Sequence, residues 1–69
     1  MADPSLVNGL KAARTRLGLT QADLAERVGV TRKTINTVEN GVFVPSTVLA
    51  LRLAKALGEP VEQLFWIEE

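Results

Sequence analysis

The sequence predicts an all-α fold, a compact bundle of five short helices within one domain. Apolar residues recur at the three- and four-residue steps of a helix, and a glycine follows most of these segments. Strand signals are poor, since aromatic residues make up only 4% of the chain and no segment alternates cleanly between apolar and polar residues. With 69 residues, of which 46% are hydrophobic, the chain can close a single small core.

The first two helices follow from their apolar spacing and their end signals. The first is expected over Ser5–Leu17, with Gly18 as a left-handed stop. Its apolar stripe, at steps of four, three and four residues, consists of Leu6, Leu10, Ala13 and Leu17. Thr20 is expected to cap the second helix in a capping box that Asp23 completes, and Gly29 to end it. The inner face of this second helix consists of Leu24, Ala25 and Val28.

The remaining helices are delimited in the same way. Thr31 is expected to cap a third helix that runs to about Asn40 and stops at Gly41. After a loop over residues 42–45, Ser46 caps a fourth helix, Thr47–Leu57. A short fifth helix follows, with a proline suited to its first turn. The inward-facing residues of that helix are Val61, Leu64 and Phe65.

The third helix has an unusual outward face. When its residues are placed at helical intervals, two cations, two amides and a hydroxyl lie on one side, with no carboxylate among them. These residues are Arg32, Lys33, Asn36, Asn40 and Thr37. Ile35 and Val38 lie on the opposite side and would hold the helix to the core. Such a set of donors can meet phosphates and base edges in a DNA major groove.

The pattern of the second and third helices resembles a known DNA-binding family. Gln21, Ala25, Gly29, Ile35 and Val38 match the helix-turn-helix signature of the lambda-repressor-like (Cro/cI, XRE) family, and so do the strings RLGLTQADLAERVGV and TVENG. The small Ala25 would let the two helices cross closely, and Gly29 would permit the turn between them. The resemblance implies a DNA-binding domain over residues 6–65, followed by a short tail over 66–69.

By this resemblance several residues are expected to contact DNA. They are Gln21, Thr31, Arg32, Lys33, Asn36, Thr37 and Asn40. Gln21 would bond a phosphate and brace the first residue of the third helix. Arg32 would reach a guanine by two hydrogen bonds, Lys33 a base or a phosphate, and Asn40 a phosphate.

Two charged residues lie on surfaces that face the core. Arg14 falls within the apolar stripe of the first helix, and Glu39 lies on the inward edge of the third. Together they predict a structural ion pair between these helices, and the resembling family has such a pair at the matching positions. A catalytic role for Glu39 is disfavoured.

Family members usually bind DNA as two-fold dimers, so a homodimer is expected. The candidates for the self-complementary patch are Leu51, Trp66 and Ile67, together with Phe43. The loop over residues 42–44 is apolar where the family often has basic residues. Its side chains would either pack inside the protein or face a partner.

Composition restricts the remaining classes of function. The chain has no histidine and no cysteine, and we expect neither catalysis nor a cofactor or metal site. Residues 11–33 hold six basic and two acidic side chains, whereas residues 34–69 hold two basic and five acidic ones. This asymmetry favours a basic face despite a net charge of zero. The leading hypothesis is a cytoplasmic, nucleoid-associated transcriptional repressor that binds double-stranded DNA and no membrane. The alternatives are a DNA-binding antitoxin, whose acidic tail docks a toxin, and a protein-interaction module.

Overall fold

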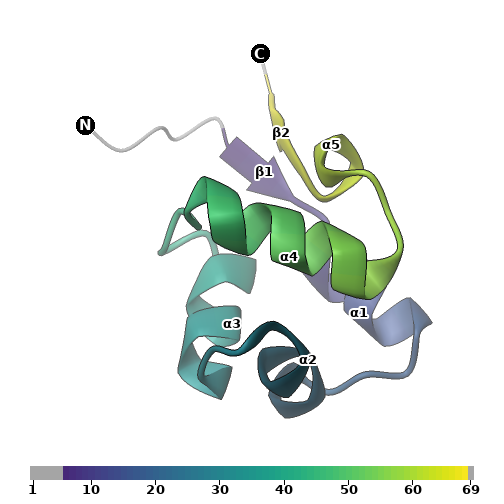
Figure 1. The fold of residues 1–69 in the computed structure, drawn as a ribbon. Coiled ribbons are helices and arrows are strands. Elements are labelled where there is room, and N and C mark those ends of the chain that lie inside the picture. Colours follow the sequence, from purple (N-terminus) through teal and green to yellow (C-terminus); the bar gives the residue numbers. More distant parts are fainter. Residues whose placement is uncertain (1–5, 69) are drawn as a thin grey trace.

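The computed structural model describes residues 6–68, which form five helices and one pair of short strands (Figure 1). In chain order these are β1 (Leu6–Asn8), α1 (Leu10–Arg16), α2 (Gln21–Val28), α3 (Arg32–Glu39), α4 (Thr47–Leu57), α5 (Val61–Leu64) and β2 (Phe65–Ile67). In Figure 1, α4 runs across the front of the molecule, with α2 and α3 below it and α5 and the strands above. The expected all-α bundle of five helices is confirmed, with a small sheet added.

The helix starts are set by local hydrogen bonds. The side chains of Thr20, Thr31 and Ser46 each accept a bond from the backbone N–H three residues further on, at 3.0, 3.2 and 3.1 Å. Asp23 completes the capping box, because its carboxylate accepts a bond of 2.9 Å from the backbone N–H of Thr20. These bonds hold the pKa of Asp23 below its ordinary value. Since each bond is local, the sequence was sufficient to place these three helix starts.

The expected start of the first helix is wrong. Leu6, Val7 and Asn8 form β1 rather than the first turns of a helix, and α1 begins only at Leu10. The expected first residue, Ser5, lies outside the described residues. At the other end of the predicted stripe, Leu17 is 52% exposed. The stripe at helical spacing therefore describes α1 only between Leu10 and Ala13, which are both buried.

A contact between the two ends of the chain explains the strand. β1 pairs with β2 in antiparallel register, with Leu6 opposite Ile67, Val7 opposite Trp66 and Asn8 opposite Phe65. The pairing continues in a bond of 2.9 Å from the Gly9 N–H to the carbonyl oxygen of Leu64. Strands this short are set by cross-strand partners rather than by their own pattern. The partner lies more than fifty residues away, which local spacing does not reveal.

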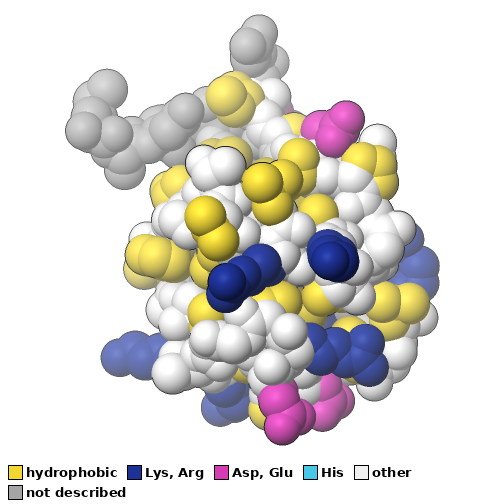
Figure 2. Space-filling view, viewed as in Figure 1, with side chains coloured by type: hydrophobic (Ala, Val, Ile, Leu, Met, Phe, Trp, Pro, Cys, Tyr) yellow, Lys and Arg dark blue, Asp and Glu magenta, His cyan; other side chains and the backbone are white. Residues whose placement is uncertain are grey.

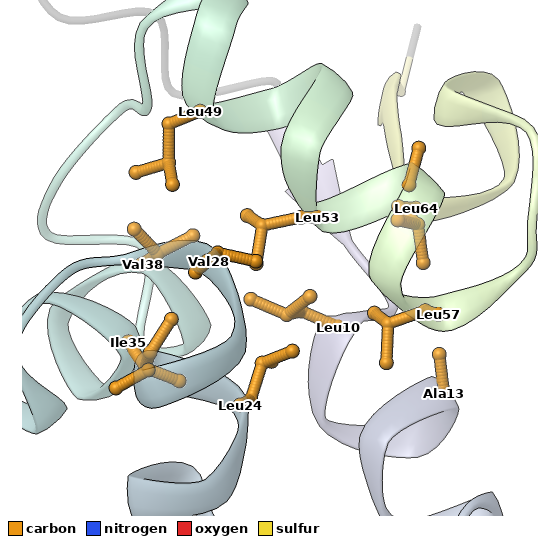
Figure 3. Packing of buried hydrophobic residues seen from close by; sticks show 12 residues of the cluster. Leu10, Ala13, Leu24, Val28, Ile35, Val38, Leu49, Leu53, Leu57 and Leu64 are labelled. Carbon is orange, nitrogen blue, oxygen red and sulfur yellow. The ribbon is translucent and has the colours of Figure 1, made fainter.

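The core lies between all five helices, and Leu53 of α4 is at its centre. Figure 3 shows this side chain pointing into the cluster, toward Leu10 of α1 and Val28 of α2. Ile35 and Val38 of α3 are 0% and 1% exposed. Burying these two side chains fixes which face of α3 is turned to solvent. The core therefore sets the orientation of the candidate functional face.

Candidate nucleic-acid interface

The solvent face of α3 carries the donors expected from the sequence. Arg32, Lys33 and Asn36 are exposed, and Thr37 is half-buried at the edge of the face. The one carboxylate of this helix, Glu39, is turned inward, and its side chain is only 4% exposed. The exposed face is thus cationic and rich in hydrogen-bond donors, without an acid to repel a phosphate.

Several of these polar groups already have partners within the protein. The Thr31 hydroxyl caps α3, and the Thr37 hydroxyl donates to the carbonyl oxygen of Thr34 at 3.0 Å. The side-chain amide of Asn40 donates to the carbonyl oxygen of the Asn36 side chain at 3.2 Å. The two hydrogen-bonded amides are both exposed at the end of α3, where together they could contact neighbouring base edges or phosphates.

Arg14 and Glu39 lie together in the buried region between α1 and α3. The Arg14 Nε lies 2.6 Å from Glu39 Oε2, and its Nη2 lies 3.1 Å from Oε1. The third nitrogen, Nη1, donates to the carbonyl oxygen of Leu19 at 2.9 Å. The Arg14 side chain is 9% exposed. The bond to the Glu39 carboxylate raises the pKa of Arg14 above its ordinary value, because it favours the charged guanidinium.

The position of Gln21 differs from the expectation. Its side-chain nitrogen donates to Glu39 Oε1 at 3.1 Å, at the last residue of α3 rather than at the first. The expected brace on Arg32 is therefore replaced by a bond to the buried pair. The reason is that Glu39 Oε1, turned inward to meet Arg14, lies close to the start of α2. Sequence spacing alone did not indicate this third member of the network.

An open hollow of about 400 Å³ adjoins this network. It lies where the loop between α1 and α2 approaches the start of α3, and Arg14, Gln21 and Arg32 all line it. The hollow thus brings the buried Arg14, the half-buried amide of Gln21 and the exposed guanidinium of Arg32 to one place on the surface. Its guanidinium and amide donors suit an anionic group such as a phosphate.

Asn8 is a residue whose role the sequence did not indicate. Its side-chain nitrogen donates to the carbonyl oxygen of Val38 at 3.1 Å, and its oxygen accepts from the Leu10 N–H at 3.2 Å. It therefore ties the end of α3 to β1 and starts α1 at the same time. The Asn8–Gly9 dipeptide, a turn signal, was the feature of the sequence that could have indicated this break.

The candidate dimer residues are exposed, and Trp66 lies on a different surface from Leu51 and Ile67. Leu51 is 54% exposed and lines a groove of about 300 Å³ together with Leu6, Val44 and Phe65. Ile67 is opposite Leu6, on the same face of the sheet, whereas Trp66 is on the other face and lies against Gly9. The apolar loop is exposed as well, with Val42, the first of its three residues, at 78%.

The outer surface over α4 is divided between apolar and basic side chains. Figure 2 shows hydrophobic side chains over the upper half of this face and Lys and Arg side chains across its middle. Arg27 of α2 and Arg52 and Lys55 of α4 line a shallow hollow below the helix, together with the acidic Glu26 of α2. Within residues 6–68, no helix is long and apolar enough to cross a membrane.

Comparison with known proteins agrees with this geometry. The helix-turn-helix family matches the chain over residues 10–64. A protein of Methanothermobacter thermautotrophicus is 52% identical over 61 residues, covering 87% of this chain and 88% of the relative. YgzD of Bacillus subtilis is 47% identical over 62 residues, covering 90% and 94%. Both relatives bear the name of uncharacterized HTH-type transcriptional regulators.

A solved structure shows the same fold. The restriction-modification controller protein C.AhdI from Aeromonas hydrophila superposes with a TM-score of 0.76 at 39% identity, over 81% of this chain and 85% of that protein. Family, relatives and fold are all those of DNA-binding regulators rather than enzymes. The chain therefore belongs to the helix-turn-helix family of DNA-binding transcriptional regulators, of the lambda-repressor-like (XRE) type.

Proposed function

We propose that this protein is a sequence-specific regulator that reads the major groove of an operator with α3. The observation that carries the proposal is the exposed face of this helix. Arg32, Lys33 and Asn36 point to solvent, while the only carboxylate of α3 is turned inward onto Arg14. An exposed helix face without an acid can approach the phosphates that flank a major groove at no repulsive cost.

The roles of the two cations are expected to differ. Arg32, in the first turn of α3, is placed to meet the two acceptors of a guanine, a contact that discriminates by about 1–3 kcal/mol. Lys33 carries a point charge that suits a phosphate. Replacing Arg32 should then relax one position of the operator, whereas replacing Lys33 should weaken binding to all sequences alike.

The test is selection of bound duplexes from a random pool, followed by affinity measurements at several salt concentrations. Arg32→Ala should lose preference at one position of each half-site. Lys33→Ala should keep the preference and reduce the log–log salt slope by about 0.9. Arg52→Ala is the matched control, because it removes an exposed cation from α4 instead of α3 and should change neither quantity. Equal affinity of the parent protein for every duplex would overturn the proposal.

We also propose that the protein binds a palindromic operator as a homodimer, with recognition helices about 34 Å apart. The groove beside α4 supports a self-complementary contact, since its wall is almost entirely apolar and Leu51 stands exposed at its edge. Ile67 shares the sheet face of the groove residue Leu6 and extends this surface. Trp66, on the opposite sheet face, is expected to contribute less.

Sedimentation equilibrium tests this second proposal. Leu51→Glu should shift the protein toward monomer, because it places a charge in an apolar contact. Leu17→Glu provides the control, since Leu17 has nearly the same exposure, 52%, and lies outside the groove. A Leu51→Glu protein that is as dimeric as the parent would remove the groove from the interface.

Repression is the mode of action that this fold supports directly, because occupying an operator within a promoter blocks transcription through DNA binding alone. A purified transcription assay with the selected operator should show less transcript as the protein is added. An increase in transcript would make the protein an activator. The same proposal implies that the protein acts in the cytoplasm, where the operator is.

A further inference from the structure

Gln21, Glu39 and Arg14 form one connected network that joins the buried core to the surface of the candidate interface. Glu39 Oε1 accepts from both Gln21 and Arg14, at 3.1 Å in each case, while Oε2 accepts from Arg14 at 2.6 Å. Arg14 and Glu39 are nearly inaccessible, with side chains 9% and 4% exposed, whereas Gln21 is half-buried and lines the hollow.

A primary amide has two N–H groups and a carbonyl oxygen, and the bond to Glu39 uses one N–H. A half-buried glutamine that is held at one N–H has a defined orientation, with the other polar atoms directed away from the acceptor. Gln is among the side chains that lose most rotamer freedom when they are ordered. Holding Gln21 in the free protein therefore removes an entropic cost that a mobile side chain would incur on binding.

The charge of Glu39 would ordinarily oppose a phosphate at this position. Arg14 neutralises it through two hydrogen bonds and keeps this charge pair formally neutral. Arg32 lines the same hollow and adds a cation to it. The surface that remains is an oriented amide beside a guanidinium, which is suitable for an anionic oxygen.

We propose that Glu39 is a positioning residue for DNA binding: it holds the Gln21 amide so that the second N–H bonds a phosphate oxygen seated in the hollow. Arg14 makes this arrangement possible by cancelling the charge of Glu39. This inference rests on the proposed DNA-binding function and adds to it a role for the buried ion pair. The pair is then part of the binding surface as well as a link between helices.

The test is a double-mutant cycle measured by affinity for the selected operator. Gln21→Ala should weaken binding about tenfold, the effect expected for one hydrogen bond to a charged group. It should leave the salt slope unchanged, since Gln21 carries no charge. In an Arg14→Met/Glu39→Leu background, which removes both charges together, Gln21→Ala should cost less than about twofold, because Gln21 is no longer held.

Glu39→Gln is the conservative control for the cycle. It keeps an acceptor oxygen for Gln21, and in this background Gln21→Ala should again cost about tenfold. All variants are compared below their unfolding temperatures, after circular dichroism has shown that they are folded. If Gln21→Ala costs the same in the parent and in the Arg14→Met/Glu39→Leu protein, Glu39 does not position Gln21 and the inference is wrong.

A second measurement does not depend on the folding of any variant. Side-chain ¹⁵N relaxation of the parent protein without DNA should show a restricted Gln21 amide and a mobile Gln63 amide, since Gln63 is exposed on α5. A Gln21 amide as mobile as that of Gln63 would overturn the inference. Absence of any DNA binding by the parent would instead overturn the proposed function, so the two failures are distinguishable.

Discussion

Replacing Arg14 by Met removes the cation from a buried pair while keeping much of the apolar volume of its side chain. The change leaves the Glu39 carboxylate, with 4% of its side chain exposed, without the guanidinium that faces it. It also deletes the bond to the carbonyl oxygen of Leu19. Breaking such a pair by removing one partner costs about 3–5 kcal/mol, because an uncompensated charge stays buried.

This cost is large for so small a domain. At about 0.05–0.15 kcal/mol per residue, the 69 residues have a total stability of about 3–10 kcal/mol. Each kcal/mol of lost unfolding free energy lowers the thermal unfolding midpoint of a domain of this size by about 4–8 °C. Arg14→Met should therefore lower the unfolding temperature by at least about 12 °C, or leave the protein partly unfolded at room temperature.

Thermal and urea unfolding followed by circular dichroism measure the effect. Arg14→Met/Glu39→Leu is the informative partner variant, because it removes both charges and should recover most of the lost stability. The base preference of folded Arg14→Met protein should be that of the parent, since the role inferred for Arg14 concerns a phosphate contact and not the reading of bases. An unchanged midpoint for Arg14→Met, or a double variant less stable than the single one, would refute the role of the pair.

Three further substitutions test other parts of the fold. Leu53→Ala, at a side chain that is 0% exposed, should cost about 2–5 kcal/mol in urea unfolding, whereas the matched Leu17→Ala at 52% exposure should stay within about 0.5 kcal/mol. Asp23→Asn should flatten the loss of thermal stability below about pH 4. Because the pKa of Asp23 is lowered in the folded protein, its carboxylate stabilises the fold above the unfolded-state pKa. This contribution is lost as the pH falls through the folded-state pKa. A parallel decline in both proteins would contradict this. Gly29→Ala should lower the thermal unfolding midpoint, because φ is +77° at this residue and a side chain there costs about 1–2 kcal/mol of strain. The added methyl group itself meets open space. An unchanged unfolding midpoint would show that the turn relaxes.

Sequence reasoning succeeded where the determining contacts are local. The starts of α2, α3 and α4 follow from Thr20, Thr31 and Ser46, each of which accepts a bond from a residue three positions away. The helix ends are equally local, since the left-handed Gly29 and Gly58 directly follow α2 and α4. A pattern that is complete within one turn of helix can be recognised without knowing the rest of the fold.

Sequence reasoning failed where the partner is distant. Leu6 and Leu10 are spaced as on a helix, yet Leu6 lies in β1, because its neighbour Val7 pairs with Trp66 at the other end of the chain. Leu17 continued the predicted stripe and is nevertheless exposed. Spacing does not distinguish a short strand from a helical turn when tertiary pairing supplies the hydrogen bonds.

In the candidate interface, too, the sequence determined some features and the tertiary structure determined others. That α3 has a polar face free of carboxylates and an apolar face with Ile35 and Val38 was determined by the sequence, because helical geometry assigns residues to faces at fixed angles. That Gln21 reaches Glu39, and that both meet Arg14 beside one hollow, was decided only by the tertiary structure. These residues come from three helices, and only the packing of the shared core determines the distances between them.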